Sequence, residues 1–189
     1  MAVRFLFSAV LFQSLALSCL AQQPAGLESP WGVRTILVNL TKDTAELKPI
    51  LDSLRPQEWY DKKGAPSTYI LQLQNAQQQA RDVAAASNLL GQQTESLSLA
   101  LDDYFRMEAL EFTTRSLEEG TRRYGDRATA DKLSQLIGRN FSNRERFRDY
   151  IRDLAGTTEQ NFKIADEEAQ RCRGMISREP AARTKGVRK

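Results

Sequence analysis

Carboxylate, tyrosine and tryptophan side chains are the groups in this 189-residue chain that could do chemistry, because the sequence contains no histidine. Histidine is the commonest general base and a frequent metal ligand. Its absence excludes Ser-His-Asp and Cys-His nucleophile arrangements, most zinc sites and the Glu-x-x-His di-iron sites of helical bundles. The phosphate-binding patterns G-x-G-x-x-G and G-x-x-x-x-G-K-[ST] are also missing. We therefore expect no cofactor and no metal.

The carboxylates that could act as general acids or bases occur in three runs, Asp102-Asp103, Glu118-Glu119 and Asp166-Glu167-Glu168. Neighbouring residues on a helix point about 100° apart, so these runs do not converge on one substrate atom. Several acids also precede an arginine by four residues, which is the spacing of surface ion pairs. We interpret Glu108, one turn beyond Tyr104, as a residue at the edge of an apolar helix face. The sequence nominates no catalytic residue.

Trp59 and Tyr60 lie together in a connector that contains proline and glycine. A connector of this length has to cover one end of a helical bundle, and two aromatic side chains can plug that end while their polar atoms meet water or backbone. We favour this interpretation. In the alternative, Trp59 and Tyr60 contact a ligand or partner, and the protein is a small-ligand carrier or a carboxylate-dependent enzyme with a site inside the bundle near this pair.

The C-terminal segment is strongly basic. Residues 171–189 contain seven Lys or Arg side chains and one acid, Glu179. Such a segment attracts polyanions with an affinity that falls as salt rises. It has no aromatic residue for base stacking, so we expect no nucleic acid. The candidate contacts to an anionic envelope component are Arg178, Arg183, Lys185, Arg188 and Lys189. A tail that only keeps the chain soluble is the simpler interpretation.

Residues 1–21 resemble a signal peptide. Arg4 precedes an apolar run from Phe5 to Leu17, and small residues precede the polar Gln22. The run is too short and too polar for a transmembrane helix. We expect cleavage after Ala21 and export to the periplasm or the medium. The alternative is a mature protein that is lipid-anchored through Cys19.

Apolar residues that recur in steps of three and four predict four long amphipathic helices. The helices are expected from Val33 or Asp43 to Leu54, from Pro66 or Ser67 to Gly91, from Glu95 to Tyr124 and from Ser142 to about residue 174, with a short helix over 127–137. No segment alternates as a strand does. The predicted fold is all-α, an up-down bundle over 33–174, with a flexible leader at 22–32 and a disordered tail at 175–189.

The periodicity also predicts which residues are buried. The third long helix is expected to bury one broad face made of Leu97, Leu101, Tyr104, Phe105 and Phe112, with a second line at Leu110, Leu117 and Tyr124. The last helix is expected to bury the stripe Phe147, Ile151, Leu154, Thr158, Phe162, Ala165, Ala169, Cys172 and Ile176. We therefore interpret Cys172 as a core thiol.

Three local features of the helices follow from single residues. The register of the last helix survives Gly156, so we favour one continuous helix there. Ser142 and Glu145 fit a capping box at its start, and Asp43 with Glu46 fits a capping pair in the first helix. Pro49 lies either inside the first helix as a kink or early in a helix that begins at Asp43.

Together these features predict an exported, non-enzymatic helical bundle that acts as an envelope-associated binding, scaffold or chaperone-like protein. Its partner would be a protein, an anionic envelope component or a second copy of the chain. The sequence identifies none of these partners individually.

Overall fold

The computed structural model describes residues 29–178, and over this range the protein is all-helical, without a strand. The helices are α1 (Pro30–Ser53), α2 (Pro56–Lys63), α3 (Thr68–Gln92), α4 (Leu97–Tyr124), α5 (Arg127–Arg139) and α6 (Phe141–Arg178). This confirms the all-α prediction, and the predicted connector around Trp59 contains the short helix α2. The predicted signal peptide at 1–21 and the end of the basic tail lie outside the described residues.

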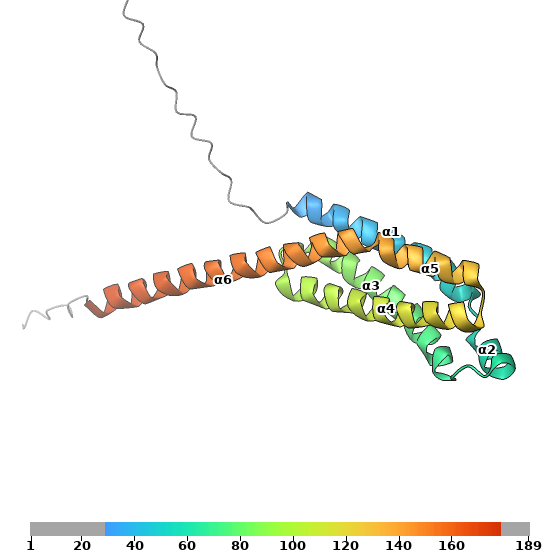
Figure 1. Ribbon diagram of the computed structural model, residues 1–189. Helices are drawn as coiled ribbons and strands as arrows, with labels where there is room; N and C mark the ends of the chain where they lie inside the picture. The colour runs from blue at the N-terminus through green and yellow to red at the C-terminus, as the bar shows by residue number, and fades with distance from the viewer. Residues whose placement is uncertain (1–28, 179–189) are drawn as a thin grey trace, which may run out of the picture.

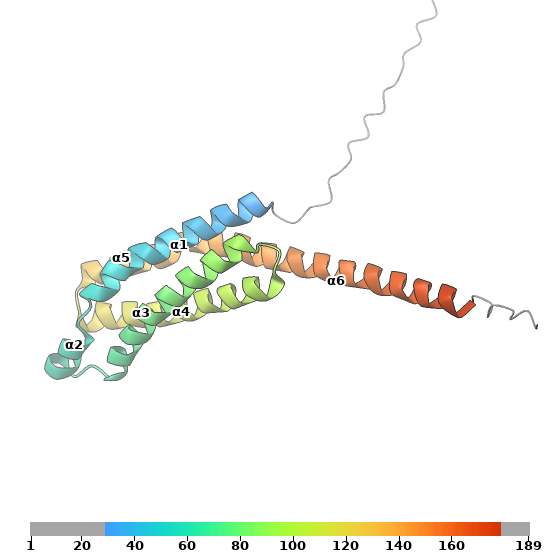
Figure 2. The same ribbon diagram turned by 180° about the vertical axis from the view of Figure 1, so that it is seen from behind.

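Helices α1, α3, α4, α5 and the first half of α6 pack along their lengths around one core (Figure 1 and Figure 2). We call α1–α5 together with residues 141–155 the helical body. Its fully buried apolar side chains come from five helices and include Ile36, Leu51, Val83, Leu90, Leu117, Leu133 and Phe147. Helix α2 adds Trp59 at the end where α3 begins and α4 ends.

Helix α1 is continuous from Pro30 although it contains Pro49. The Ser29 hydroxyl accepts a hydrogen bond from the Gly32 amide at 3.1 Å, and Pro30 occupies the first turn, where its missing N–H is tolerated. Residues 30–32, assigned to the leader from the sequence, are therefore helical. Asp43 and Glu46 lie in the middle of α1, so the capping pair predicted there is wrong.

Helix α6 begins at Phe141, and the capping box predicted at Ser142 is therefore wrong. Only Asn140 separates α5 from α6, and its carbonyl already accepts the Arg144 amide at 3.0 Å. Glu145 pairs instead with Arg148 on the next turn. The helix continues through Gly156, which confirms the prediction of one continuous helix.

Helix α4 buries a different face from the one predicted. Phe105 is 64% exposed and Phe112 is 78% exposed, whereas Leu110 and Leu117 are buried as expected. Besides Met107, the rest of the buried line consists of small or polar residues, namely Ala100, Asp103, Thr113, Thr114, Gly120 and Thr121. α4 lies against both α3 and α5, and its small residues allow close approach of these helices. At Gly120 the Tyr69 ring of α3 takes the space that a side chain of α4 would fill.

The second half of α6 leaves the helical body. Every described side chain from Gly156 to Ser177 is exposed, and we call residues 156–178 the α6 arm (Figure 1). The predicted stripe is therefore correct as far as Leu154 and wrong beyond it. Cys172 is exposed and is not a core thiol. Residues 175–178, assigned to the disordered tail, belong to the helix.

Neighbouring helices explain where burial on α6 stops. The loop between α3 and α4 turns back at residues 93–96, and α1 begins at Pro30 near the same end of the body (Figure 2). The Tyr150 hydroxyl donates to the Thr94 carbonyl of this loop and marks the last turns of α6 that touch the rest of the chain. Beyond Leu154 none of the described helices covers α6.

Candidate functional site

The two aromatic residues of the predicted plug have different surroundings. Trp59 is 5% exposed, and its ring meets the edge of Tyr69 with centroids 6.0 Å apart. Tyr69 in turn contacts Tyr124 of α4 at a centroid distance of 6.0 Å, so three rings close this end of the core. Tyr60 is half exposed and points outward. Trp59 is therefore part of the core, and a ligand or partner contact at Tyr60 stays a prediction.

The basic residues proposed to meet an anionic partner lie at the margin of the described chain. Arg178 is the last residue of α6. Arg183, Lys185, Arg188 and Lys189 lie outside the described residues. The structure therefore leaves their proposed role as a prediction.

Three of the carboxylates considered for acid–base chemistry, Asp102, Glu108 and Glu118, form ion pairs with arginine. Asp102 pairs with Arg106 at 2.8 Å, and Glu118 pairs with Arg122 at 2.5 Å. Both pairs have the i,i+4 spacing expected from the sequence. Glu108 is about half exposed and lies 3.3 Å from Arg144 of α6, which agrees with its interpretation as an edge residue. These acids stabilise the helices through ion pairs within or between them.

Asp103 differs from its neighbour Asp102 because it is fully buried. The Ser87 hydroxyl of α3 donates to both of its carboxylate oxygens, at 3.1 and 2.9 Å. Burial raises the pKa of Asp103 to about 7, although the Ser87 hydrogen bond acts in the opposite direction. The spacing Ala100, Asp103, Met107, Leu110 places it on the buried line of α4, and that spacing was the signal that sequence reasoning missed.

A cleft of about 50 Å³ lies between α1, α4, α5 and α6. Its polar lining residues are Asp43, Thr44, Glu111, Asn140 and Arg144, and its apolar walls include Leu40, Leu47, Met107, Leu110 and Leu136. The space is large enough for a few water molecules or for the end of a small polar ligand. Because these residues come from four helices far apart in the sequence, no local pattern indicated them.

The charges around this cleft are paired. Arg139 lies 2.9 Å from Asp43 and also binds Glu46, and Arg144 pairs with Glu111. The hydrogen bond from Arg139 lowers the pKa of Glu46 and raises that of the arginine. One uncharged polar atom of the cleft has no partner: the side-chain oxygen Oδ1 of Asn140 is buried and makes no hydrogen bond within the described residues. This atom could accept a hydrogen bond from a bound molecule.

A second groove lies on the surface between α1 and α3, with a volume of about 230 Å³. Its floor is apolar and includes Ala45, Leu51, Ala80 and Ala84, while Lys48, Asp52 and Arg81 stand at its rim. The hydrogen bond from Lys48 lowers the pKa of Asp52. Its buried polar residue, Thr44, already donates its hydroxyl to the Leu40 carbonyl at 2.9 Å, so we do not assign a site to this groove.

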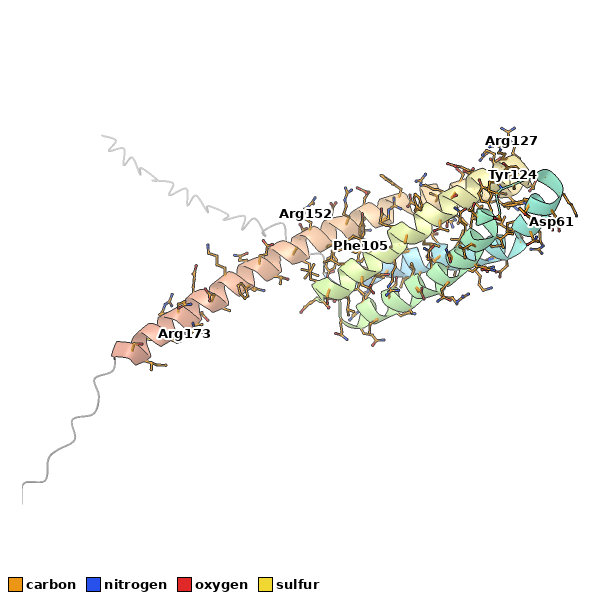
Figure 3. All side chains as sticks on the ribbon, turned by 90° about the horizontal axis from the view of Figure 1, so that it is seen from below. Asp61, Phe105, Tyr124, Arg127, Arg152 and Arg173 are labelled. Carbon is orange, nitrogen blue, oxygen red and sulfur yellow. The ribbon has the colours of Figure 1, made fainter. Side chains whose placement is uncertain are left out.

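The α6 arm is a long helix surface that the other described helices leave uncovered. Phe162 is 75% exposed and Ile176 is 72% exposed, and Ile164 and Met175 are also exposed on the same helix. Single exposed apolar residues are ordinary, but a series of them along one helix indicates an interaction surface. Figure 3 shows the side chains of this arm, including Arg173, far from the helical body.

The part of the chain that the structure describes, residues 29–178, offers neither a metal-ligand cluster nor a bilayer-spanning helix. In this range no three or more His, Cys, Asp or Glu side chains are grouped so that they could hold a metal ion. In the same range none of the helices combines the length and apolar character needed to cross a bilayer.

Comparisons with known proteins give no family for this chain. No protein-family model, curated protein or solved structure matches it. Its function therefore has to be inferred from the cleft, the ion pairs and the α6 arm.

Proposed function

We propose that the protein is an exported, non-enzymatic up-down helical bundle that acts as an envelope-associated binding or scaffold protein. The observation that carries this proposal is the α6 arm, where Phe162 and Ile176 are exposed on a helix that leaves the body. Amphipathic helices commonly bind by laying such a face against a partner. A chaperone-like protein would use the same surface for unfolded chains.

The ion pairs of the body support a structural role for its carboxylates. Asp102, Glu111 and Glu118 each have an arginine partner, so they are engaged in holding the helices. The export part of the proposal rests on the pattern of residues 1–21. The basic side chains at 183–189 remain proposed contacts to an anionic envelope component.

A photo-crosslinking amino acid at Phe162 tests the binding role. The full-length gene with this change is expressed in the source organism, and crosslinked molecules are identified by mass spectrometry. We expect crosslinks from position 162 and few from Phe112, which is equally exposed on α4 and serves as the matched control. Equal labelling from both positions, or none from position 162, would contradict a binding role of the arm.

The mature N-terminus tests the proposed export. Intact mass spectrometry of the protein from fractionated cells should give a chain that begins at Gln22. Acylated Cys19 would support the lipid-anchored alternative instead. A chain that retains Met1 and stays in the cytosol would overturn export.

A second candidate function is small-ligand binding, and the unpartnered Oδ1 of Asn140 favours it. This site would be the cleft between α1, α4, α5 and α6 rather than the Trp59-Tyr60 end. Native mass spectrometry of the purified protein should then show a co-purifying molecule that Met107→Trp, which fills the cleft, removes. If no molecule co-purifies, small-ligand binding at this cleft is contradicted, and Asn140 contacts only water.

A further inference from the structure

One apolar stripe on α6 is covered in its first half and uncovered in its second. Phe147 and Leu154 are buried against the other helices of the body. The same line continues in steps of three and four through Phe162, Ala165, Ala169, Cys172 and Ile176, all of them exposed. Among residues 29–178, nothing along the arm replaces the packing layer that α1 and α4 supply to the first half.

An arm of this kind is marginal as an isolated helix. It is about 35 Å long at 1.5 Å per residue, and Gly156 and Gly174 both lower its helical propensity. Most helical stability in proteins comes from packing of the apolar face rather than from propensity. We therefore expect another helix against the stripe.

The charges of the arm indicate which helix fits. Three adjacent acids, Asp166, Glu167 and Glu168, occupy its middle, and Arg171 and Arg173 follow them. Within the part of the chain that the structure describes, none of the three acids forms an ion pair with a cation. A complementary partner needs cations opposite the middle of the arm and carboxylates opposite its end. The same arm, in the reverse direction, meets both needs.

We propose that two copies of the chain dimerise by antiparallel pairing of their α6 arms. This inference rests on the proposed binding role of the arm and names its partner as a second copy. The pairing is isologous, so each favourable contact occurs twice about a two-fold axis.

The repeat on the stripe defines the register. A coiled-coil stripe alternates two core positions, a and d, and in an antiparallel pair each a position lies opposite a d position of the other helix. Ala169 therefore lies opposite Cys172 of the second copy, and Ala165 lies opposite its Ile176. This register places Asp166 beside Arg173 of the second copy, twice per dimer. The small side chain of Ala169 near the axis permits close approach of the two helices.

The shape of the chain excludes the parallel alternative. In a parallel pair, both bodies would lie at the same end of the arms. They would clash there, because α1 and α4 of each chain already fill the space over the stripe at Phe147 and Leu154. In the antiparallel pair, the arms overlap and the two bodies lie at opposite ends. Figure 3 shows that the arm leaves the body from one end, which this arrangement requires.

Sedimentation velocity over a range of concentrations tests the dimer. The sample is the protein purified after expression of the full-length gene. We expect a reversible shift from one to two chain masses. Ile176→Glu should weaken the dimer at least tenfold, whereas Val38→Glu, an equally exposed position on α1, should leave it unchanged. Circular dichroism should show that both variants stay folded, since neither side chain is part of the core. A chain that is monomeric throughout, or a dimer lost with Phe112→Glu but kept with Ile176→Glu, would overturn the proposal.

Charge exchange tests the orientation. Asp166→Arg and Arg173→Glu should each weaken the dimer at least tenfold, and the double variant should restore it. Parallel arms would instead bring Glu168 beside Arg173 of the second copy. Restoration by the Glu168→Arg, Arg173→Glu pair alone would therefore overturn the antiparallel pairing.

Crosslinking from Phe162 separates this inference from the proposed function. Crosslinks between two copies support the dimer. Crosslinks only to another protein, together with a monomeric chain, overturn the dimer and leave the binding role of the arm intact. Crosslinks to residues 1–28 of the same chain overturn both, because the arm would then be covered internally.

Discussion

Asp103 and Ser87 make a polar contact between α4 and α3 inside a core that is otherwise mainly apolar. Both side chains are buried, and the carboxylate has no cation among its hydrogen-bond partners in the described chain. Removing a carboxylate from water disfavours its ionised form, which is why the pKa of Asp103 rises to about 7. The pH at which the protein is most stable depends on this one residue more than on its surface ion pairs.

We predict that the protein loses stability as pH rises from about 4 to 7. The folded state holds a proton on Asp103 up to a pKa of about 7, whereas the ordinary value is 3.8, so the folded state binds more protons between these values. The three-unit difference corresponds to a loss of about 4 kcal/mol, complete above pH 7. About 2.5 kcal/mol of this loss falls between pH 5 and pH 8, and urea unfolding at these two pH values measures it.

Asp103→Asn should flatten this dependence, because the amide cannot ionise and can still accept a hydrogen bond from Ser87. The exposed Asp61→Asn serves as the control and should keep the wild-type profile. An Asp103→Asn protein with the same pH dependence as wild type would show that another group is responsible.

Leucine truncations test the burial assigned to α4 and α6. Leu154 is 3% exposed, so Leu154→Ala should reduce the free energy of unfolding by about 2–5 kcal/mol. Leu101 is 36% exposed although the sequence placed it in the core, so Leu101→Ala should reduce it by less than about 1 kcal/mol. Chemical denaturation gives both values. Equal losses would mean that Leu101 is covered in solution.

At the scale of the elements, the contact between α3 and α4 depends on a glycine. A Cβ atom at Gly120 would lie 2.6 Å from the Tyr69 ring, which itself contacts Trp59 and Tyr124. The aromatic cluster can close this end of the body only because α4 has no side chain at that point. Lys63 donates to the Tyr124 carbonyl at 2.5 Å and joins the end of α2 to the same helix end.

Gly120→Ala should therefore destabilise the protein by about 1–3 kcal/mol, since the ring of Tyr69 has to move to accommodate the methyl group. Gly138→Ala is the matched control. Its added methyl group meets no atom within 4 Å, so the change should be neutral or stabilising by up to about 1 kcal/mol. Thermal unfolding of the two variants provides the comparison. A Gly120→Ala protein as stable as wild type would show that α3 and α4 pack less closely.

At the scale of the whole molecule, a compact body carries a long helix that contributes little to it. All core residues lie between Val33 and Leu154, and every described side chain from Gly156 onward is exposed. The body and the α6 arm should therefore unfold independently, and the arm is free to form contacts with other molecules.

A chain that ends at Glu159 should keep the melting temperature of the full chain to within about 3 °C, because it loses no buried contact. The measurement is made by circular dichroism at a concentration below that at which the full chain dimerises. The truncated chain should show less helical signal but the same transition. A larger decrease in melting temperature would show that the arm packs on the body.

The sequence by itself determined the helical class and most helix boundaries. Apolar residues in steps of three and four predicted α3, α4 and α5 to within a few residues, because each helix must bury a face whatever its neighbour is. The continuity of α6 through Gly156 followed from the same register. The missing histidines and phosphate-binding motifs also argue from the sequence alone against histidine-dependent catalysis and phosphate-loop nucleotide binding.

The tertiary structure alone decided which of several apolar faces is covered. Phe105, Phe112 and Cys172 lie on regular stripes and are nevertheless exposed, because a stripe records a helix face and contains no information about where a neighbouring helix ends. The cleft around Asn140 has the same origin, since its residues come together only when four helices pack. Burial depends on neighbours, and neighbours are a property of the folded chain.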